Sequence, residues 1–374
     1  MGTMIDYLNW RGDLSFEESP FNEVDGLLLS NLAYVEFQSI VASPWEECTI
    51  TLREASERFW ETESERKILH EFSLIKMAPF YMRRMAETRR FAELKLMYYQ
   101  NLLDEEQQSQ FAALCIEVGP ELYFVAFRGT DNTMIGWKEN FHMCFEVVPA
   151  QRRAVMYLNL VAGKLRQRGD THLILGGHSK GGNLAVYAAA KAKPSVQEQI
   201  RQIYNNDGPG FAKSILRSVG YERIRDKIRK YVPESSFIGM LLEQDRNYQV
   251  VSSRESGFRQ HDPGSWRVFG TCFVTIPQRD RDSQLFDRTM HNWIYSLSPE
   301  ERRQIVNLLF EWIAQAEIRT LNDLGGREGK KKRKLLRKQL QINPDYRQML
   351  RQAGKQMMEE FSLSLSDMRR RKHR

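Results

Sequence analysis

The spacing of apolar residues predicts that the first half of the chain contains helices followed by strands. Residues 24–35 and 54–85 mix apolar and polar positions in a helical pattern. Three apolar runs of strand length follow, at residues 94–99, 111–118 and 122–127. A short Gly119-Pro120 turn separates the last two runs. We therefore expect these two runs to form a β-hairpin.

After Gly129, strands and helices alternate. The predicted order is a helix at 154–165, a strand at 173–175, a helix at 183–192, a strand at 202–205, a helix near 211–219 and a strand at 228–232. Strand-like runs at 248–252 and 268–276 and a helical pattern at 286–295 follow. Such alternation is typical of βαβ units and a parallel sheet. The whole pattern predicts an α/β fold with a mixed, mostly parallel sheet and helices on both faces.

Composition limits the class of protein. The 374 residues are 41% hydrophobic and 11% aromatic, which suits a globular core and excludes collagen-like, mucin-like and disordered chains. No apolar run approaches the roughly 20 residues of a membrane-spanning helix, and the first residues lack a signal-peptide pattern. The four cysteines, at positions 48, 115, 144 and 272, are scattered without a CxxC pair. We therefore expect reduced thiols, a cytoplasmic location and no cysteine-based zinc site.

Positive charge is concentrated at the C-terminal end. The net charge is +7, yet residues 323–374 alone hold 16 basic and 6 acidic residues. Basic runs at 330–334 and 369–372 flank apolar residues at helical spacing, which predicts a basic, partly helical tail. We therefore expect a main domain at 1–322 and a tail at 323–374. The tail either keeps the protein in solution or binds nucleic acid or the anionic inner membrane surface through 327–338 and 369–374.

The motif that carries most chemical information is Gly177-His178-Ser179-Lys180-Gly181. It follows an apolar strand and opens a helix, which is the setting of a nucleophile elbow. Glycines on both sides of Ser179 fit such a turn, because backbones come close there and a Cβ would clash. A structural or phosphate-binding glycine turn is the alternative, but neither GxxxxGK[ST] nor GxGxxG occurs here. Ser179 is therefore the candidate nucleophile.

A serine nucleophile needs a histidine base, which follows the serine in chain order in this type of fold. His172 begins the strand that leads to the elbow, and His178, next to Ser179, is expected to point away. His261 lies in a polar turn between two predicted strands, whereas His291 lies in a predicted helix. We favour His261 as the base and keep His291 as the alternative.

We expect Asp207 to be the acid that orients the base, with Glu234 as the alternative. Asp207 directly follows the strand after the elbow helix, and parallel strands present their carboxyl ends at one edge of the sheet. Glu234 follows the next strand.

An oxyanion hole is also required, and we expect backbone N–H groups from Thr130, after the strand at 122–127, and from Lys180.

The pairing of Phe127-Arg128-Gly129-Thr130 with Gly177-His178-Ser179-Lys180-Gly181-Gly182 resembles the class 3 (fungal-type) lipases. Together with the segments 7–13 and 20–25, it resembles a bacterial lipase-like α/β-hydrolase family of unknown function, over about residues 5–300. The resemblance implies an α/β-hydrolase fold, with Ser179 as nucleophile, Thr130 as oxyanion residue and His261 as base. The chain departs from class 3 lipases at the acid, because 234–236 is Glu-Ser-Ser where those lipases have an Asp.

The sequence thus predicts a serine hydrolase of carboxylic esters, with an acyl-lipid substrate and a Ser179–His261–Asp207 triad that forms an acyl-enzyme. This mechanism implies no metal or organic cofactor. The alternative is an α/β-hydrolase fold without catalytic activity that serves as a binding or scaffold protein anchored by its basic tail.

Overall fold

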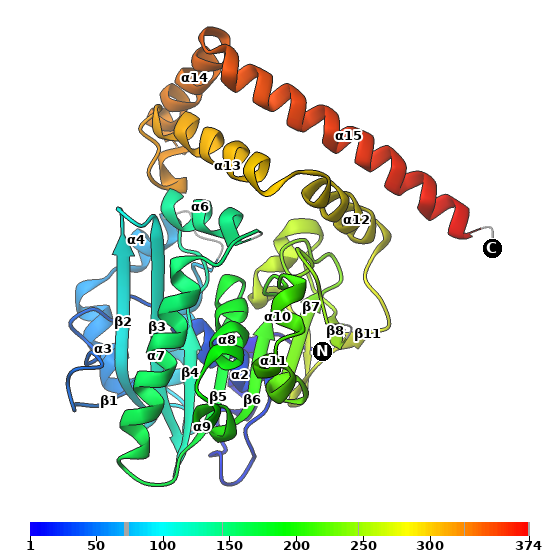
Figure 1. Cartoon of the computed structure of the whole chain (residues 1–374). Helices are drawn as coiled ribbons and strands as arrows, with labels where there is room; N and C mark the ends of the chain where they lie inside the picture. Colours follow the sequence, from blue (N-terminus) through cyan, green and yellow to red (C-terminus); the bar gives the residue numbers. More distant parts are fainter. Residues whose placement is uncertain (71–74, 144, 246, 325, 373–374) are drawn as a thin grey trace.

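The computed structural model describes residues 1–374 except 71–74, 144, 246, 325 and 373–374. Its centre is a nine-stranded sheet in the order β1-β2-β3-β4-β5-β6-β7-β8-β11 (Figure 1). Neighbouring strands from β1 to β4 are antiparallel, those from β4 to β8 are parallel, and β11 is antiparallel to β8. The mixed sheet predicted from the sequence is confirmed, with four parallel and four antiparallel pairings among its described strands.

The strands and helices have the following bounds. The strands are β1 Ile50–Thr51, β2 Lys95–Asp104, β3 Ser109–Gly119, β4 Leu122–Phe127, β5 His172–His178, β6 Ile200–Asn206, β7 Ile228–Pro233, β8 Tyr248–Val251, β9 Val268–Phe269, β10 Cys272–Phe273 and β11 Thr275–Ile276. The helices are α1 Met4–Arg11, α2 Glu23–Leu32, α3 Leu52–Thr62, α4 Glu65–His70, α5 Ala78–Ala86, α6 Met134–Met143, α7 Pro149–Arg166, α8 Lys180–Lys191, α9 Pro194–Gln199, α10 Lys213–Leu216, α11 Val219–Ile224, α12 Arg281–Ser296, α13 Pro299–Ala314, α14 Gly326–Ile342 and α15 Pro344–Lys372. Short 3₁₀ helices are η1 Arg225–Lys227, η2 Gly257–His261, η3 Pro263–Ser265 and η4 Leu321–Leu324.

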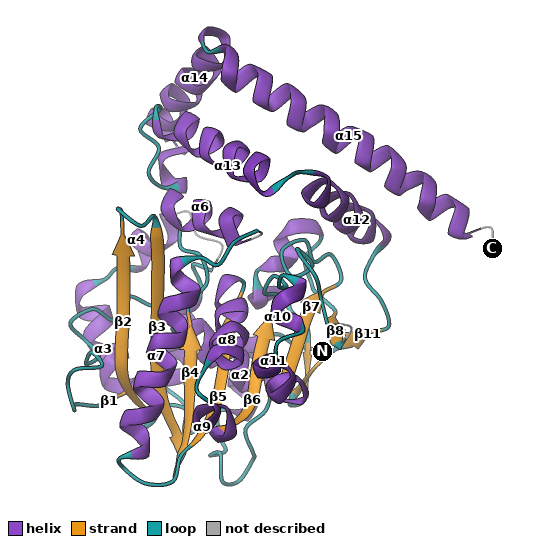
Figure 2. Ribbon diagram, in the orientation of Figure 1, coloured by secondary structure: helices purple, strands orange, loops and turns teal. Residues whose placement is uncertain are grey.

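Helices cover both faces of the sheet, as Figure 2 shows. The strands alternate, so Phe124 and Ala126 of β4 pack with α1, α2, α3 and α5, whereas Val125 and Phe127 pack with α7 and α8. This alternation is the expected consequence of the two-residue repeat of a strand. Two large apolar clusters, one on each face, therefore enclose the sheet. The α/β-hydrolase fold expected from the sequence is confirmed.

Local predictions differ from the structure in three places. The run at 268–276, predicted as one strand, is divided into β9, β10 and β11, because Gly270 has φ +61° and allows the chain to turn between β9 and β10. The helical pattern at 54–85 is divided into α3, α4 and α5, and its residues 71–74 lie outside the described part. The helix near 211–219 is two short helices, α10 and α11.

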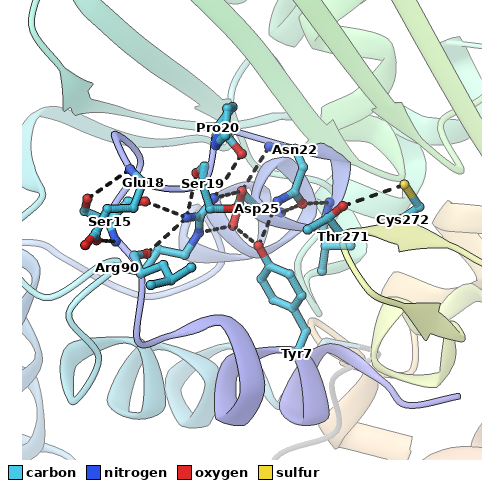
Figure 3. Close-up of polar contacts among 12 residues, drawn as sticks. Tyr7, Ser15, Glu18, Ser19, Pro20, Asn22, Asp25, Arg90, Thr271 and Cys272 are labelled. Carbon is cyan, nitrogen blue, oxygen red and sulfur yellow. Dashed lines mark hydrogen bonds and ion pairs between the residues drawn. The ribbon is translucent and has the colours of Figure 1, made fainter.

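A buried ion pair fixes the N-terminal segments against the body (Figure 3). The guanidinium of Arg90 donates to both carboxylate oxygens of Asp25, at 2.8 and 2.6 Å, and both side chains are fully buried. Tyr7 donates to the same carboxylate at 2.7 Å, and Asn22 donates to the Tyr7 hydroxyl at 2.8 Å. Arg90 also donates to backbone carbonyls at residues 14, 15, 19 and 20. The two N-terminal segments that carry the family resemblance thus meet in one structural network.

The C-terminal helices α12 to α15 lie beyond the carboxyl ends of the parallel strands (Figure 1). Helix α13 packs against α6 of the body, where the rings of Phe141 and Phe310 lie 5.8 Å apart, and α15 packs along α12 and α13. No helix in the described residues is long and apolar enough to cross a bilayer. The division into units 1–322 and 323–374 stays a prediction.

Candidate active site

Ser179 lies at a strained turn between β5 and α8. Its φ of 56° and ψ of −131° place it in a conformation that side-chain-bearing residues rarely adopt. The flanking glycines are required by close backbone approach. A Cβ at Gly177 would lie 2.2 Å from the carbonyl carbon of Gly181, and a Cβ at Gly181 would lie 2.1 Å from the carbonyl oxygen of Phe127. The local geometry is that of a nucleophile elbow.

The structure brings Ser179, His261 and Asp207 into one hydrogen-bonded chain. His261 Nε2 lies 3.0 Å from Ser179 Oγ, and His261 Nδ1 lies 2.6 Å from Asp207 Oδ2. All three residues are at least nine-tenths buried. Because the carboxylate only accepts, Nδ1 carries a proton and Nε2 can accept the proton of the serine hydroxyl. This arrangement can move a proton from Ser179 to His261.

Each partner of Ser179 is held by its own loop. Asp207 follows β6 with φ 52°, and its second oxygen accepts a hydrogen bond of 2.5 Å from the Ser236 hydroxyl. His261 ends η2, where the indole N–H of Trp266 donates to the carbonyl of Gln260 at 2.9 Å. The loop after β6, at the carboxyl ends of the parallel strands, and the loop after β8 therefore meet at the elbow.

The alternative residues lie elsewhere. The Glu234 carboxylate accepts from the Gln260 side chain at 3.2 Å, and the carboxylate within hydrogen-bond distance of His261 Nδ1 is that of Asp207. His291 lies on α12, where its Nε2 is 3.3 Å from a Glu243 oxygen. Neither Glu234 nor His291 is part of the chain that ends at Ser179 Oγ.

His178 does not point away from the site, contrary to the sequence-based expectation. Its ring centroid lies 4.6 Å from that of His261, and its Nε2 lies 2.8 Å from the His261 carbonyl oxygen. Because that oxygen only accepts, Nε2 donates and Nδ1 is free to accept from the Tyr34 hydroxyl at 3.1 Å. Burial and the neighbouring His261 hold the pKa of His178 well below its usual range. A neutral His178 therefore supports the backbone of His261, a role that adjacency in the sequence conceals.

A buried lysine supports the loops on either side of Asp207. Lys230 of β7 donates to the carbonyls of Gly208 and Gly239, at 2.9 and 2.7 Å, and also to the Gln244 side chain. A Cβ at Gly239 would lie 2.1 Å from Asp207 Oδ1, so the two loops are in direct contact. Burial lowers the pKa of Lys230 to about 7.

The two expected oxyanion residues flank the elbow. Thr130 follows β4, and its hydroxyl accepts from the Asn140 amide at 2.5 Å. Lys180 begins α8, so its backbone N–H has no acceptor within the helix. Its side chain turns away into the core, where Nζ contacts Glu139 at 3.0 Å and the carbonyl of Gln110 at 2.9 Å. The backbone N–H of Lys180, and not its side chain, is therefore the group of this residue that suits an oxyanion.

A cavity of about 30 Å³ lies against Ser179 and His261, and its wall includes Thr130, Trp137 and Ile238. At about 10–15 Å³ per water, it has room for about two waters or a small reacting group. Among the described residues, no group of three or more His, Cys, Asp or Glu side chains could hold a metal ion.

Comparison with known proteins places the chain in a family. The crystal structure of M37 lipase matches with 12% sequence identity and a TM-score of 0.35, over 58% of this chain and 68% of that one. No curated protein matches the sequence significantly. The model of the Mbeg1-like family matches residues 85–311, more than half of the chain, including the elbow, Asp207 and His261. The chain belongs to the Mbeg1-like family.

Proposed function

We propose that the protein is a serine hydrolase that cleaves carboxylic esters through an acyl-enzyme. The observation that carries this proposal is the continuous hydrogen-bonded chain from Asp207 through His261 to Ser179, at 2.6 and 3.0 Å, on a nucleophile elbow. A serine that merely stabilised the turn would not need a histidine and a buried carboxylate in line with its hydroxyl.

In the proposed reaction, Ser179 Oγ attacks the ester carbonyl while His261 Nε2 takes the hydroxyl proton. Asp207 stabilises the imidazolium, and the backbone N–H groups of Thr130 and Lys180 hold the oxyanion of the tetrahedral intermediate. The intermediate collapses when the C–O bond to the alcohol breaks and His261 returns the proton to the leaving oxygen. Water, activated by the same histidine, then attacks the acyl-enzyme and releases the carboxylic acid.

Labelling with a fluorophosphonate probe tests the proposal, because the probe reacts only with an activated serine. We expect the wild type to be labelled and to hydrolyse p-nitrophenyl butyrate, and we expect Ser179→Ala and His261→Ala to lose both properties. His291→Ala is the matched control, because it removes a histidine outside the hydrogen-bonded chain. Absence of both labelling and hydrolysis in folded wild type would favour a binding protein that uses this fold without catalysis.

We also propose that the basic tail docks the protein on an anionic membrane, which would provide the acyl-lipid substrate. On α14, Lys330, Lys334, Arg337 and Lys338 recur at helical spacing and are exposed. Beside them on the same helix, Leu335 and Ile342 are 40% and 68% exposed. Adjacent basic and apolar stripes fit a lipid interface better than nucleic acid, which offers no acyl region to the apolar stripe. The basic run at 369–374 extends to residues 373–374, which lie outside the described part. A cytoplasmic location at the inner membrane surface remains part of this proposal.

Vesicle sedimentation tests the docking. Each basic side chain near an anionic surface contributes about 1 kcal/mol, so Lys330→Gln with Lys334→Gln should lower partitioning to phosphatidylglycerol vesicles roughly thirtyfold. Lys191→Gln with Lys193→Gln, two exposed lysines on the body, is the control. Equal partitioning of both double variants would contradict the docking, as would retention by duplex DNA but not by vesicles.

A further inference from the structure

An apolar cavity lies between helix α6 and the two C-terminal helices α12 and α13. It has a volume of about 180 Å³ and is walled by side chains of α6, of the loop after β7, and of α12 and α13. Its wall includes Phe141, Leu241, Trp293, Ile294 and Val306. Among the described residues that line it, Lys180 and Arg302 are the charged ones. Lys180 pairs with Glu139, and the guanidinium of Arg302 lies 5.4 Å from the centroid of the Tyr295 ring.

This cavity adjoins the small cavity at Ser179. Three residues, Trp137, Asn140 and Ile238, line both. Asn140 also donates to the hydroxyl of Thr130, the expected oxyanion residue. A substrate whose carbonyl lay at Ser179 and Thr130 would therefore have its next carbons at the boundary between the two cavities.

The two cavities differ in what they can hold. The one at Ser179 has room for a reacting ester group but not for an alkyl chain. The larger one offers apolar walls, and apolar cavities of about 150 Å³ stay dry and bind molecules such as benzene. By the same measure, its 180 Å³ suits an unbranched chain of about six to eight carbons.

We infer that the cavity between α6, α12 and α13 receives the acyl chain of the substrate and selects esters of medium-length fatty acids. This inference rests on the proposed esterase function. The cavity meets the Ser179 pocket at Asn140, the partner of Thr130, so a chain attached to a carbonyl held there reaches it directly. Helices α12 and α13 thus form a wall of the substrate site. The length of the acyl chain that fits is then limited by side chains more than 100 positions downstream of the elbow.

A cavity-filling variant tests the inference. Val306 is buried on α13, so Val306→Trp places a large ring in the space meant for the chain. Each methylene buried is worth roughly fourfold in affinity, so losing three or four should lower the octanoate-to-acetate ratio of kcat/KM on the order of a hundredfold, measured with p-nitrophenyl esters. Val219→Trp, at a site 70% exposed on α11, should leave the ratio unchanged. Val306→Ala should instead move the optimum towards longer chains.

A binding measurement separates this inference from the proposed function. Calorimetric titration of 1-octanol into Ser179→Ala should show binding that Val306→Trp abolishes in the same background, with thermal unfolding confirming that both variants fold. If wild type is labelled by fluorophosphonate and hydrolyses acetate, but octanol does not bind or the ratio is the same in Val306→Trp and Val219→Trp, the acyl site is wrong and the esterase stands. If octanol binds but no ester is hydrolysed, the esterase is wrong, and with it the assignment of the cavity to an acyl chain.

Discussion

Replacing Asp207 with asparagine tests whether Asp207 or Glu234 is the carboxylate that orients His261. Asp207→Asn preserves size but removes the charge that faces His261 Nδ1 at 2.6 Å. The asparagine has two orientations. With its amide nitrogen towards His261, it forces the proton onto Nε2, which then cannot accept from Ser179. With its oxygen towards His261, it keeps the tautomer but leaves the imidazolium formed during reaction without a counter-charge.

Both orientations lower the rate. Two unit charges about 4 Å apart at an effective dielectric constant of about 20 interact by about 4 kcal/mol, which corresponds to roughly a thousandfold in rate. The wrong tautomer costs on the order of 10⁴-fold in serine proteases. We therefore expect kcat/KM for p-nitrophenyl butyrate to fall by about 10³- to 10⁴-fold in Asp207→Asn.

Glu234→Gln is the matched control, because it removes a carboxylate that contacts Gln260 and not His261. We expect it to keep most of the wild-type activity. The assay is steady-state hydrolysis together with the rate of fluorophosphonate labelling, with unfolding in urea to confirm that both variants fold. A small effect of Asp207→Asn together with a large effect of Glu234→Gln would refute the reasoning and make Glu234 the acid.

Three further predictions concern stability. Gly181→Ala should destabilise the protein by about 1–3 kcal/mol, because its Cβ would lie 2.1 Å from the Phe127 carbonyl oxygen. Its control is Gly163→Ala in α7, where the new Cβ meets open space and should stabilise the protein by about 0.5–1 kcal/mol. Urea unfolding compares the two variants. Arg90→Met should destabilise the protein by about 3–5 kcal/mol, because it leaves the buried Asp25 carboxylate without its cation. Adding Asp25→Leu to this variant should restore part of the lost stability. An unchanged urea midpoint in the single variant would contradict this prediction. The pKa of Lys230 is lowered from 10.5 to about 7, so the unfolded state binds more protons between these values and the free energy of unfolding should rise with pH there, by at most about 1.4 kcal/mol per pH unit. Lys230→Met should lack that contribution when urea unfolding is compared at pH 7 and pH 9.5.

The sequence predicts those features that depend on local spacing and chain order. The two-residue alternation of β4 and the glycines around Ser179 are local signals, so the sheet and the elbow follow from them. The order serine, acid, histidine excludes the histidines that precede Ser179, and the loop position of His261 favours it over His291 in a predicted helix. Chain order does not distinguish Asp207 from Glu234, since both follow neighbouring parallel strands, although Asp207 is the acid that the sequence analysis favours.

Features that depend on tertiary contacts were missed. His178 packs under His261, 83 positions away, and no pattern around the elbow indicates this contact. The buried pair of Lys180 and Glu139 joins α8 to α6 in the same way. Helix α13, by contrast, had a local signal that went unused, because Ser298 and Glu301 form a capping box at its start.

Backbone strain at two points of the catalytic chain links the fold to the proposed chemistry. Ser179 and Asp207 both have positive φ, at 56° and 52°, and each such residue costs on the order of 1–3 kcal/mol. Positive φ also occurs away from the site: Glu121 lies in the hairpin turn between β3 and β4, and Tyr98 lies within β2 where its register with β3 shifts. No hairpin accounts for Ser179 and Asp207, which lie at the carboxyl ends of adjacent parallel strands and meet the same imidazole. Positive φ alone therefore does not mark a functional residue. What distinguishes Ser179 and Asp207 is that both lie within hydrogen-bond distance of one imidazole, at 3.0 and 2.6 Å, which is the geometry that the proposed chemistry needs.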